Sequence, residues 1–159
     1  MSSRFFFLSL FTFFICCADL FGQNNMQPVK WECTYKEIDE NNGELVLTAK
    51  IEPNWHTYSQ IRPSNDGPLP TVFRFIKTPD YDLVKDVVEP DPIRIHSDVF
   101  DADVAMFSIE AIFVQKIKRN TKVAFDVMGE VEFMCCNDIQ CLPPRTVKFT
   151  VKIPKVELK

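Results

Sequence analysis

The stretch Glu44-Leu45-Val46-Leu47-Thr48-Ala49-Lys50-Ile51 shows most directly how this chain folds. Its odd-numbered residues are all apolar, whereas three of its four even-numbered positions are polar. Because successive side chains of a strand point to opposite faces, this alternation predicts a β-strand with one buried face. The preceding Asn-Asn-Gly at residues 41–43 is turn material, so a turn is expected to lead into the strand.

Five more short runs have the same character, and turn-forming residues separate them. The runs lie at residues 71–75, 111–117, 122–127, 131–134 and 147–153, and further turn signals lie at 63–68, 78–80, 90–92 and 119–120. No long stretch has the 3.6-residue period of an amphipathic helix. Many short strands at this spacing predict an all-β sandwich. The chain has no internal repeat and no linker that would divide it.

The first residues predict export. Arg4 is followed by the apolar run 5–17 and then by the polar segment 22–25, which is the layout of a secretory signal peptide. The run is shorter than the roughly 20 apolar residues of a membrane-spanning helix, so an uncleaved membrane anchor is the less favoured alternative. We expect a signal peptide at residues 1–22 and one domain at residues 28–155. The domain would be soluble in the periplasm or another exported location.

The charge pattern argues against a nucleic-acid-binding protein. The formal net charge is −4, and the 18 lysines and arginines are scattered along the chain. A nucleic-acid interface would need a basic patch or stripe, so no nucleic-acid partner is expected.

Four cysteines follow the leader: Cys33, Cys135, Cys136 and Cys141. A predicted strand runs into Cys136, the Asn-Asp pair that follows is good turn material, and two prolines keep the backbone extended after Cys141. Two cysteines that flank such a turn can approach within disulfide distance.

Spacing alone leaves both an exchangeable and a structural bridge open. A bridge across this short loop restrains the unfolded chain by only roughly 2 kcal/mol, against roughly 4.7 kcal/mol for a loop of about 100 residues. A purely structural bridge therefore gains more from distant partners such as Cys33 and Cys135. Strained or exposed disulfides, by contrast, are the exchangeable ones.

A thiolate zinc site is the third alternative, with Cys135, Cys136, Cys141 and a histidine as ligands. Adjacent cysteines on a strand seldom bind one ion, and an oxidising compartment disfavours free thiolates. We therefore expect no metal and no cofactor. His56 and His96, without a serine nucleophile or a ligand cluster, do not indicate a hydrolase.

Residues 136–144, Cys-Asn-Asp-Ile-Gln-Cys-Leu-Pro-Pro, resemble the active-site hairpin of the N-terminal periplasmic domain of the thiol:disulfide interchange protein DsbD. Three other segments resemble this family in the same order along the chain. Residues 28–31 are similar to its opening, residues 55–60 to its Trp-x-x-Tyr strand, and residues 98–100 to its cap loop. Together they span most of residues 28–153. The family fold, an immunoglobulin-like β-sandwich, agrees with the strand pattern.

The resemblance implies a role for each matching residue. Cys141 matches the cysteine that forms mixed disulfides with partners, and Cys136 matches the one that closes the intramolecular bridge. Phe100 matches the cap phenylalanine that covers the bridge, and Tyr58 matches an aromatic residue beside the site. Asp98 matches an acidic residue of the cap segment.

The cysteine spacing departs from the family. Its best-known members have five residues between the cysteines, whereas four separate Cys136 from Cys141 and five separate Cys135 from Cys141. Spacing therefore does not decide the partner of Cys141. Cys136 is preferred because Asp138 then has the family offset, while Cys33 and Cys135 stay candidates for an alternative or second disulfide.

By this resemblance, the protein is a thiol:disulfide carrier of the oxidoreductase type, and its site would include His56 where some members have tyrosine. Its partners would be thioredoxin-fold or other exported thiol proteins. The family protein continues into membrane and thioredoxin-like domains, whereas this chain stops at Lys159, so a membrane electron-transfer protein is expected to supply electrons in trans. The alternative is a non-catalytic immunoglobulin-like interaction module with a purely structural disulfide. The sequence identifies neither donor nor acceptor.

Overall fold

In the part of the chain that the structure describes, the regular elements are all β-strands, as the sequence predicts. The computed structural model describes residues 26–157, and the predicted signal peptide lies outside this range. The strands are β1 (Val29–Glu37), β2 (Asn42–Ile51), β3 (His56–Tyr58), β4 (Val72–Phe75), β5 (Tyr81–Val88), β6 (Ile93–Ser97), β7 (Ala102–Phe107), β8 (Glu110–Arg119), β9 (Phe125–Phe133), β10 (Cys135–Cys136) and β11 (Arg145–Ile153). Within the described range, no helix has the length and hydropathy that a membrane span requires.

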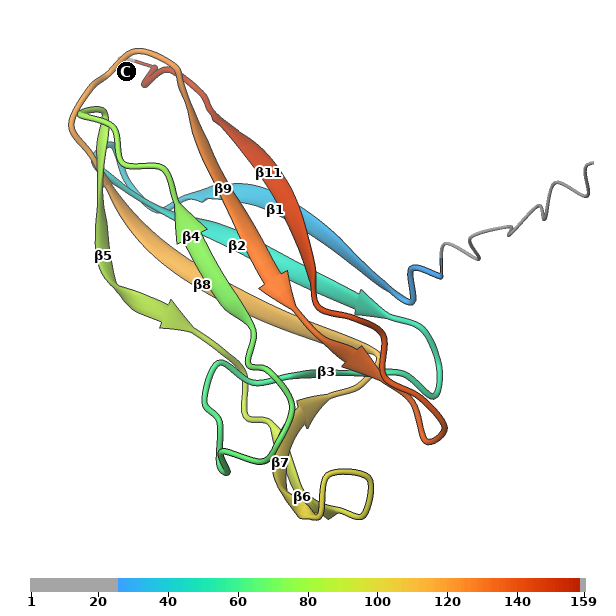
Figure 1. The fold of residues 1–159 in the computed structure, drawn as a ribbon. Helices are drawn as coiled ribbons and strands as arrows, with labels where there is room; N and C mark the ends of the chain where they lie inside the picture. The colour runs from blue at the N-terminus through green and yellow to red at the C-terminus, as the bar shows by residue number, and fades with distance from the viewer. Residues whose placement is uncertain (1–25, 158–159) are drawn as a thin grey trace, which may run out of the picture.

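Two sheets face each other, and a smaller third sheet lies at one end of the molecule (Figure 1). The first sheet has the strand order β1-β2-β8-β5, and the opposite sheet has the order β11-β9-β4. The third sheet has the order β10-β3-β7-β6. Because a single residue separates β9 from β10, the chain passes from the sandwich straight into the small sheet.

Aromatic side chains fill the space between the two large sheets. Phe113 of β8 is fully buried, and its ring centroid lies 5.0 Å from that of Phe73 on β4 in the opposite sheet. Trp31 of β1 lies 5.6 Å from both of these rings. Phe107 of β7 also packs edge-on against Phe113, at 5.5 Å. The same core therefore holds the small sheet to the sandwich.

Four of the predicted strands are confirmed. Residues 44–51, 71–75, 111–117 and 147–153 correspond to β2, β4, β8 and β11. In β2, the alternation works as expected, since Leu45, Leu47 and Ala49 are completely buried.

The predicted separation of residues 122–127 from 131–134 is wrong, because β9 runs through both as one strand. Gly129, which interrupts the apolar pattern, lies in mid-strand between the partner strands β4 and β11. A Cβ atom at Gly129 would approach the Phe149 ring to 2.5 Å and the Arg74 carbonyl oxygen to 2.6 Å. The glycine therefore permits close packing and does not end the strand.

The strands β5, β6 and β7 were not predicted. All residues of β6 except Ser97 are exposed, so this strand has no buried face that would give its sequence an alternating pattern. In β5, the pairing with β8 shifts register between Val84 and Val88, and Lys85 has a positive φ of 61°. Such a bulge moves later side chains to the other face and destroys the period of two.

Candidate functional site

A disulfide between Cys136 and Cys141 lies at the end of the molecule that carries the small sheet. Cys136 ends β10, and Cys141 pairs with it through an isolated antiparallel bridge. The two Cα atoms are 4.0 Å apart, and the two sulfur atoms are bonded. The residues in between, 137–140, form the turn of a small hairpin.

The Asn137 side chain organises this turn. Its Oδ1 accepts hydrogen bonds from the backbone N–H groups of Ile139, at 2.9 Å, and Gln140, at 2.8 Å. The Asn137 N–H donates to the Gln140 carbonyl, also at 2.9 Å. An asparagine side chain that mimics a backbone turn is a common way to reverse a chain. The turn residue expected from the sequence thus closes the loop between the two cysteines.

The two cysteines of the bridge differ in exposure. Cys136 is buried, with 3% of its surface exposed, whereas Cys141 is half-buried. A thiolate from a partner protein can therefore approach Cys141 more readily than Cys136.

Cys33 and Cys135 are free thiols, so the structure forms neither the alternative nor the second disulfide that the sequence left open. Cys135 precedes Cys136 on β10 and points to the opposite face, into the main core. Burial raises the pKa of the Cys33 thiol to about 11. Burial also raises the pKa of Cys135, and Arg145 partly offsets this. Both thiols are poor nucleophiles in the folded protein, because the thiolate is the reactive form.

Phe100 and Tyr58 pack beside the bridge. Their ring centroids lie 6.2 Å apart in an edge-to-face arrangement, and both rings belong to one apolar cluster with Cys136 and Cys141. A pocket of about 90 Å³ lies next to the bridge and is lined by Phe100, Tyr58 and Cys136. Burial, with a smaller contribution from Cys135, raises the pKa of Tyr58 to about 12. The tyrosine is therefore neutral at physiological pH.

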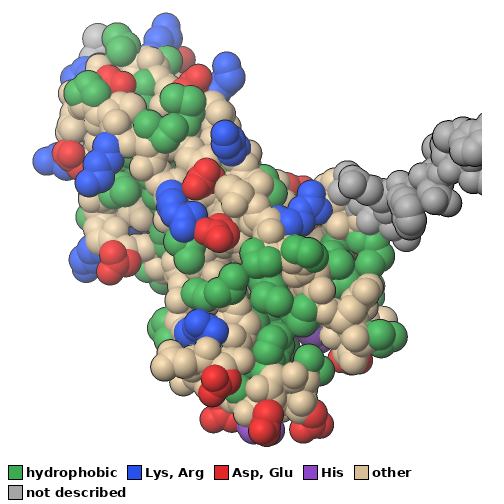
Figure 2. Space-filling view, viewed as in Figure 1, with side chains coloured by type: hydrophobic (Ala, Val, Ile, Leu, Met, Phe, Trp, Pro, Cys, Tyr) green, Lys and Arg blue, Asp and Glu red, His purple; other side chains and the backbone are tan. Residues whose placement is uncertain are grey.

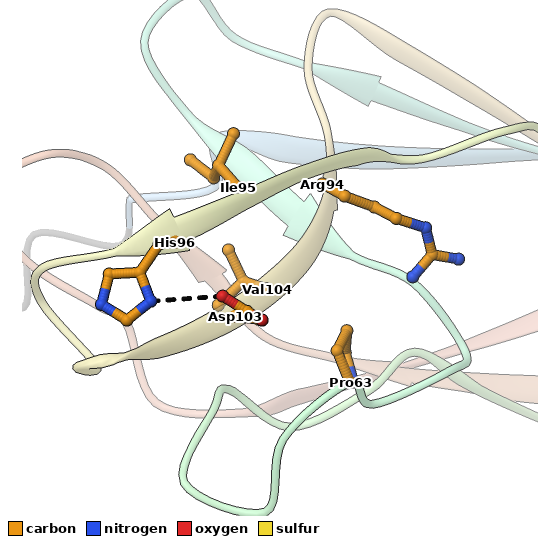
Figure 3. A pocket seen from close by; sticks show the side chains of 6 residues that line it. All are labelled: Pro63, Arg94, Ile95, His96, Asp103 and Val104. Carbon is orange, nitrogen blue, oxygen red and sulfur yellow. Dashed lines mark hydrogen bonds and ion pairs between the residues drawn. The ribbon is translucent and has the colours of Figure 1, made fainter.

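Phe100 is carried by the cap loop, residues 98–101, which connects β6 and β7. The Phe100 N–H donates to the Ser97 carbonyl at 3.2 Å. Below the loop, His96 Nδ1 lies 3.2 Å from Asp103 Oδ1 across the two strands (Figure 3). His96 Nε2 lies 3.6 Å from Asp101 Oδ1. Asp103 and Asp101 raise the pKa of His96, because they stabilise the protonated ring.

His56 lies directly opposite Cys136 in the pairing of β3 with β10. Its Nδ1 atom is 2.8 Å from the hydroxyl of Ser108. Asp138 lines the rim of the same pocket, while Asp98 is exposed and does not line it. Of the seven residues expected at this site, only Asp98 is thus away from the pocket and the bridge.

The sequence missed several residues that complete the site. Ile95, Val99, Val104 and Met106 line the pocket from β6, the cap loop and β7. Ser108 holds His56 in place. An alternating pattern in β6 and β7 would have revealed the first group, but β6 is too exposed to show one. Nothing in the local sequence marks Ser108.

Acidic side chains surround this end of the molecule. Figure 2 shows them gathered at the end formed by β6 and β7. Asp98, Asp101, Asp103 and Asp138 are all exposed. Among residues 26–157, no group of three or more His, Cys, Asp or Glu side chains is arranged to hold a metal ion.

The comparisons with known proteins agree with the geometry. A family model described as the N-terminal domain of the thiol:disulfide interchange protein DsbD matches residues 23–153. The crystal structure of the DsbD N-terminal domain from Neisseria meningitidis in the reduced form is similar, with a TM-score of 0.54 at 10% identity. The similarity covers 80% of this chain and 86% of that one.

A second similar structure is the N-terminal periplasmic domain of ScsB from Proteus mirabilis, with a TM-score of 0.51 at 14% identity. Here the match covers 80% of this chain and 47% of the ScsB chain. At such identities the likeness shows the fold, and it confirms the predicted immunoglobulin-like β-sandwich. No curated protein sequence matches the chain at a significant level.

Proposed function

Since the chain belongs to the family of the N-terminal domain of the thiol:disulfide interchange protein DsbD, we propose that it exchanges disulfides with exported proteins through Cys136 and Cys141. Partners would be thioredoxin-fold or other thiol proteins. A membrane electron-transfer protein, acting in trans, would supply the reducing equivalents.

The observation that carries this function is the place of the bridge. It closes a loop of residues 137–140 at one end of the molecule, beside a pocket, and Cys136 is not part of the two main core clusters. A disulfide across so short a loop contributes only roughly 2 kcal/mol through the unfolded chain. The aromatic core between the large sheets is complete without it. A structural role is therefore a poor account of this bridge.

The greater exposure of Cys141 supports it as the cysteine that a partner attacks. A partner thiolate attacks Cys141 Sγ in line with the bridge, and a new S–S bond forms between the partner and Cys141. The bond from Cys136 to Cys141 breaks, and its electron pair stays on Cys136. The partner's second thiol then attacks the partner's sulfur in this mixed disulfide, and Cys141 leaves. The partner is now oxidised, and Cys136 and Cys141 are both reduced. The reverse sequence reduces a partner.

Phe100 and its cap loop would control access to this chemistry. The ring packs with the bridge and Tyr58, so movement of the loop would make the sulfur atoms more accessible to small thiols and oxidants. Docking of a partner would displace the ring. Asp138 would lie beside the incoming partner, whereas Asp98 would contact a partner only from outside the pocket.

We also propose residues 28–155 as the exchange domain and residues 1–22 as a cleaved signal peptide that directs it to the periplasm. The support is the family match over residues 23–153 and the continuous set of strands from Val29 to Ile153. Mass spectrometry of the exported protein would test the cleavage site.

The function is tested by the reduction potential of the bridge and by Cys141→Ala. Equilibration with glutathione or dithiothreitol, followed by alkylation and mass spectrometry, should give a potential between roughly −180 and −270 mV. Cys141→Ala should abolish exchange, and Cys33→Ala, which removes a thiol outside the site, should leave it intact. A potential below about −300 mV, with unfolding when the bridge is reduced, would instead support the structural interaction module.

A further inference from the structure

His56 is placed to contact the sulfur that leaves during exchange. It is the Cα partner of Cys136 in the antiparallel pairing of β3 with β10. Side chains directly opposite each other in such a pair lie on the same face, with Cβ atoms about 4.5–5.5 Å apart. Both residues line the pocket beside the bridge. The cross-strand partner of Cys141, by contrast, is Cys136 itself.

The imidazole is held by one nitrogen, and the other is free. Nδ1 lies 2.8 Å from the Ser108 hydroxyl. A hydroxyl both donates and accepts hydrogen bonds, so Ser108 supports the ring whether Nδ1 carries a proton or not. Nε2 makes no hydrogen bond to any residue that the structure describes. This nitrogen can therefore give a proton or take one up.

The other titratable groups at the pocket are poorly suited to this task. Tyr58 has its pKa raised to about 12, so it does not accept a proton near neutral pH. Asp138 lies on the exposed rim, on the turn, and Asp98 lies outside the pocket. Imidazole is the side chain that ordinarily titrates between pH 5 and 8. Proton transfer at this site therefore falls to His56.

We propose that His56 is the acid and base of the exchange reaction and that it acts on Cys136; this rests on the proposed function and deepens it. When a partner thiolate attacks Cys141 and the bridge breaks, the Cys136 sulfur receives the electron pair. The imidazolium of His56 transfers a proton to this sulfur, leaving a neutral ring and a neutral thiol. In the reverse step the neutral ring removes the Cys136 proton, and the thiolate attacks the mixed disulfide at Cys141.

A buried leaving group makes this proton important. Cys136 is 3% exposed, so water cannot readily solvate a thiolate there. A charged group without a partner is costly in such a place. Protonation by the adjacent ring removes that cost as the bond breaks.

His96 provides a matched control, because the chain has two histidines and both lie on the small sheet or its edge. His96 belongs to the face of β6 that carries Arg94 and pairs with Asp103, away from the bridge (Figure 3). Ile95 and Ser97, which alternate with it, line the pocket beside Cys136. Substitution of His96 therefore removes the other imidazole of the small sheet without touching the bridge.

The test compares the rates at which dithiothreitol reduces wild type, His56→Gln and His96→Gln between about pH 5.5 and 8.5, the range that spans imidazole titration. Each rate is divided by the concentration of dithiothreitol thiolate, and samples are quenched by alkylation and read by mass spectrometry. For wild type and His96→Gln, the corrected rate should fall as the pH rises through the imidazole range. For His56→Gln, the corrected rate should be independent of pH. At the acidic end it should be about 100-fold below the wild-type rate, which is the lower limit of the contribution of a positioned general acid.

The outcomes separate this inference from the proposed function. If wild type exchanges rapidly and His56→Gln has the same corrected rate and the same pH profile, the role of His56 is refuted while the exchange function stands. If wild type itself is not reduced at a useful rate, both fail. Circular dichroism and thermal unfolding confirm that the variant is folded. His56→Asn, which also lacks a titrating ring, must behave like His56→Gln.

Discussion

At the scale of single residues, Phe100 and Tyr58 pack edge-to-face beside the bridge, and we propose that this contact controls access to it. An edge-to-face aromatic pair contributes about 0.5–1.5 kcal/mol beyond the area that it buries. Phe100 packs against the apolar cluster of Tyr58 and the bridge, whereas its loop neighbours Val99 and Asp101 are exposed. We therefore expect the ring to shield the bridge in the free protein and to be displaced when a partner docks.

Phe100→Ala should accelerate reduction of the bridge by dithiothreitol by up to about tenfold. This factor corresponds to the loss of an aromatic contact of about 1.4 kcal/mol. Timed alkylation and mass spectrometry measure the rate. Val99→Ala is the control, since it removes an exposed side chain of the same loop. Equal rates for Phe100→Ala and wild type would show that the ring does not protect the bridge.

The residues of the site could be predicted from the sequence only where a motif marks them. The cysteine hairpin and the segment with His56 and Tyr58 are such motifs, and the fold brings them to one pocket. Asp98 shares its segment with Phe100 but points to solvent, because neighbouring loop residues diverge. Ser108 contributes one hydrogen bond from a distant part of the chain, and no local pattern encodes such a contact.

At the scale of elements, the hairpin holds the two cysteines close even before they are joined. The side chain of Asn137 accepts two backbone hydrogen bonds within the turn. The Leu142 N–H donates to the Cys135 carbonyl at 2.9 Å on the far side of the bridge. These contacts favour the closed loop, and hence the disulfide, over the open dithiol.

Asn137→Ala should raise the reduction potential of the bridge by about 20–40 mV. Each hydrogen bond contributes roughly 1 kcal/mol, and 30 mV corresponds to about 1.4 kcal/mol for a two-electron couple. The potential is measured by equilibration with glutathione. Gln140→Ala is the matched control, because its exposed side chain makes no hydrogen bond to the described residues. An unchanged potential for Asn137→Ala would mean that the sheet alone positions the cysteines.

A strand could be predicted from the sequence where one of its faces is buried, because burial of one face leaves an alternating pattern of apolar and polar residues. The strands of the two large sheets alternate because one side of each meets the aromatic core, and most of them were predicted. The exposed β6 and the bulged β5 lack that pattern. The interruption of β9 was predicted wrongly because Gly129 resembles a break in the sequence, whereas it is required by the rings and backbone beside it.

At the scale of the whole molecule, charge is gathered at the reactive end. Asp138 lies beside the bridge, and Asp98, Asp101 and Asp103 are exposed at the same end of the molecule, where Asp101 and Asp103 lie close to His96. Exposed charges act over about 8 Å at physiological ionic strength. A partner that presents positive charge around its cysteine is therefore attracted, and an acidic partner is repelled.

Small thiols of opposite charge test this effect. After correction for thiolate concentration, cysteamine should reduce the bridge several-fold faster than mercaptopropionate in low salt, and the difference should shrink in about 0.5 M salt because the charges are screened. Hydroxyethyl disulfide, which is neutral, gives the intrinsic ratio of the two thiols. The double variant Asp98→Asn, Asp138→Asn should move the ratio toward that value. A ratio equal to the intrinsic one in low salt would rule out electrostatic selection.

Cys135 and Cys136 are consecutive residues of β10, so their side chains point to opposite faces of the sheet. Cys136 faces the bridge and Cys135 faces the core, so a slip of one residue would exchange their places and offer Cys141 the wrong thiol. The register is locked by the bond from the Thr57 hydroxyl to the Met134 carbonyl, at 3.1 Å. Each round of the proposed exchange would open the bridge and make a pairing error possible. The alternation of side chains along this two-residue strand would then keep the Cys135 thiol in the core and away from Cys141.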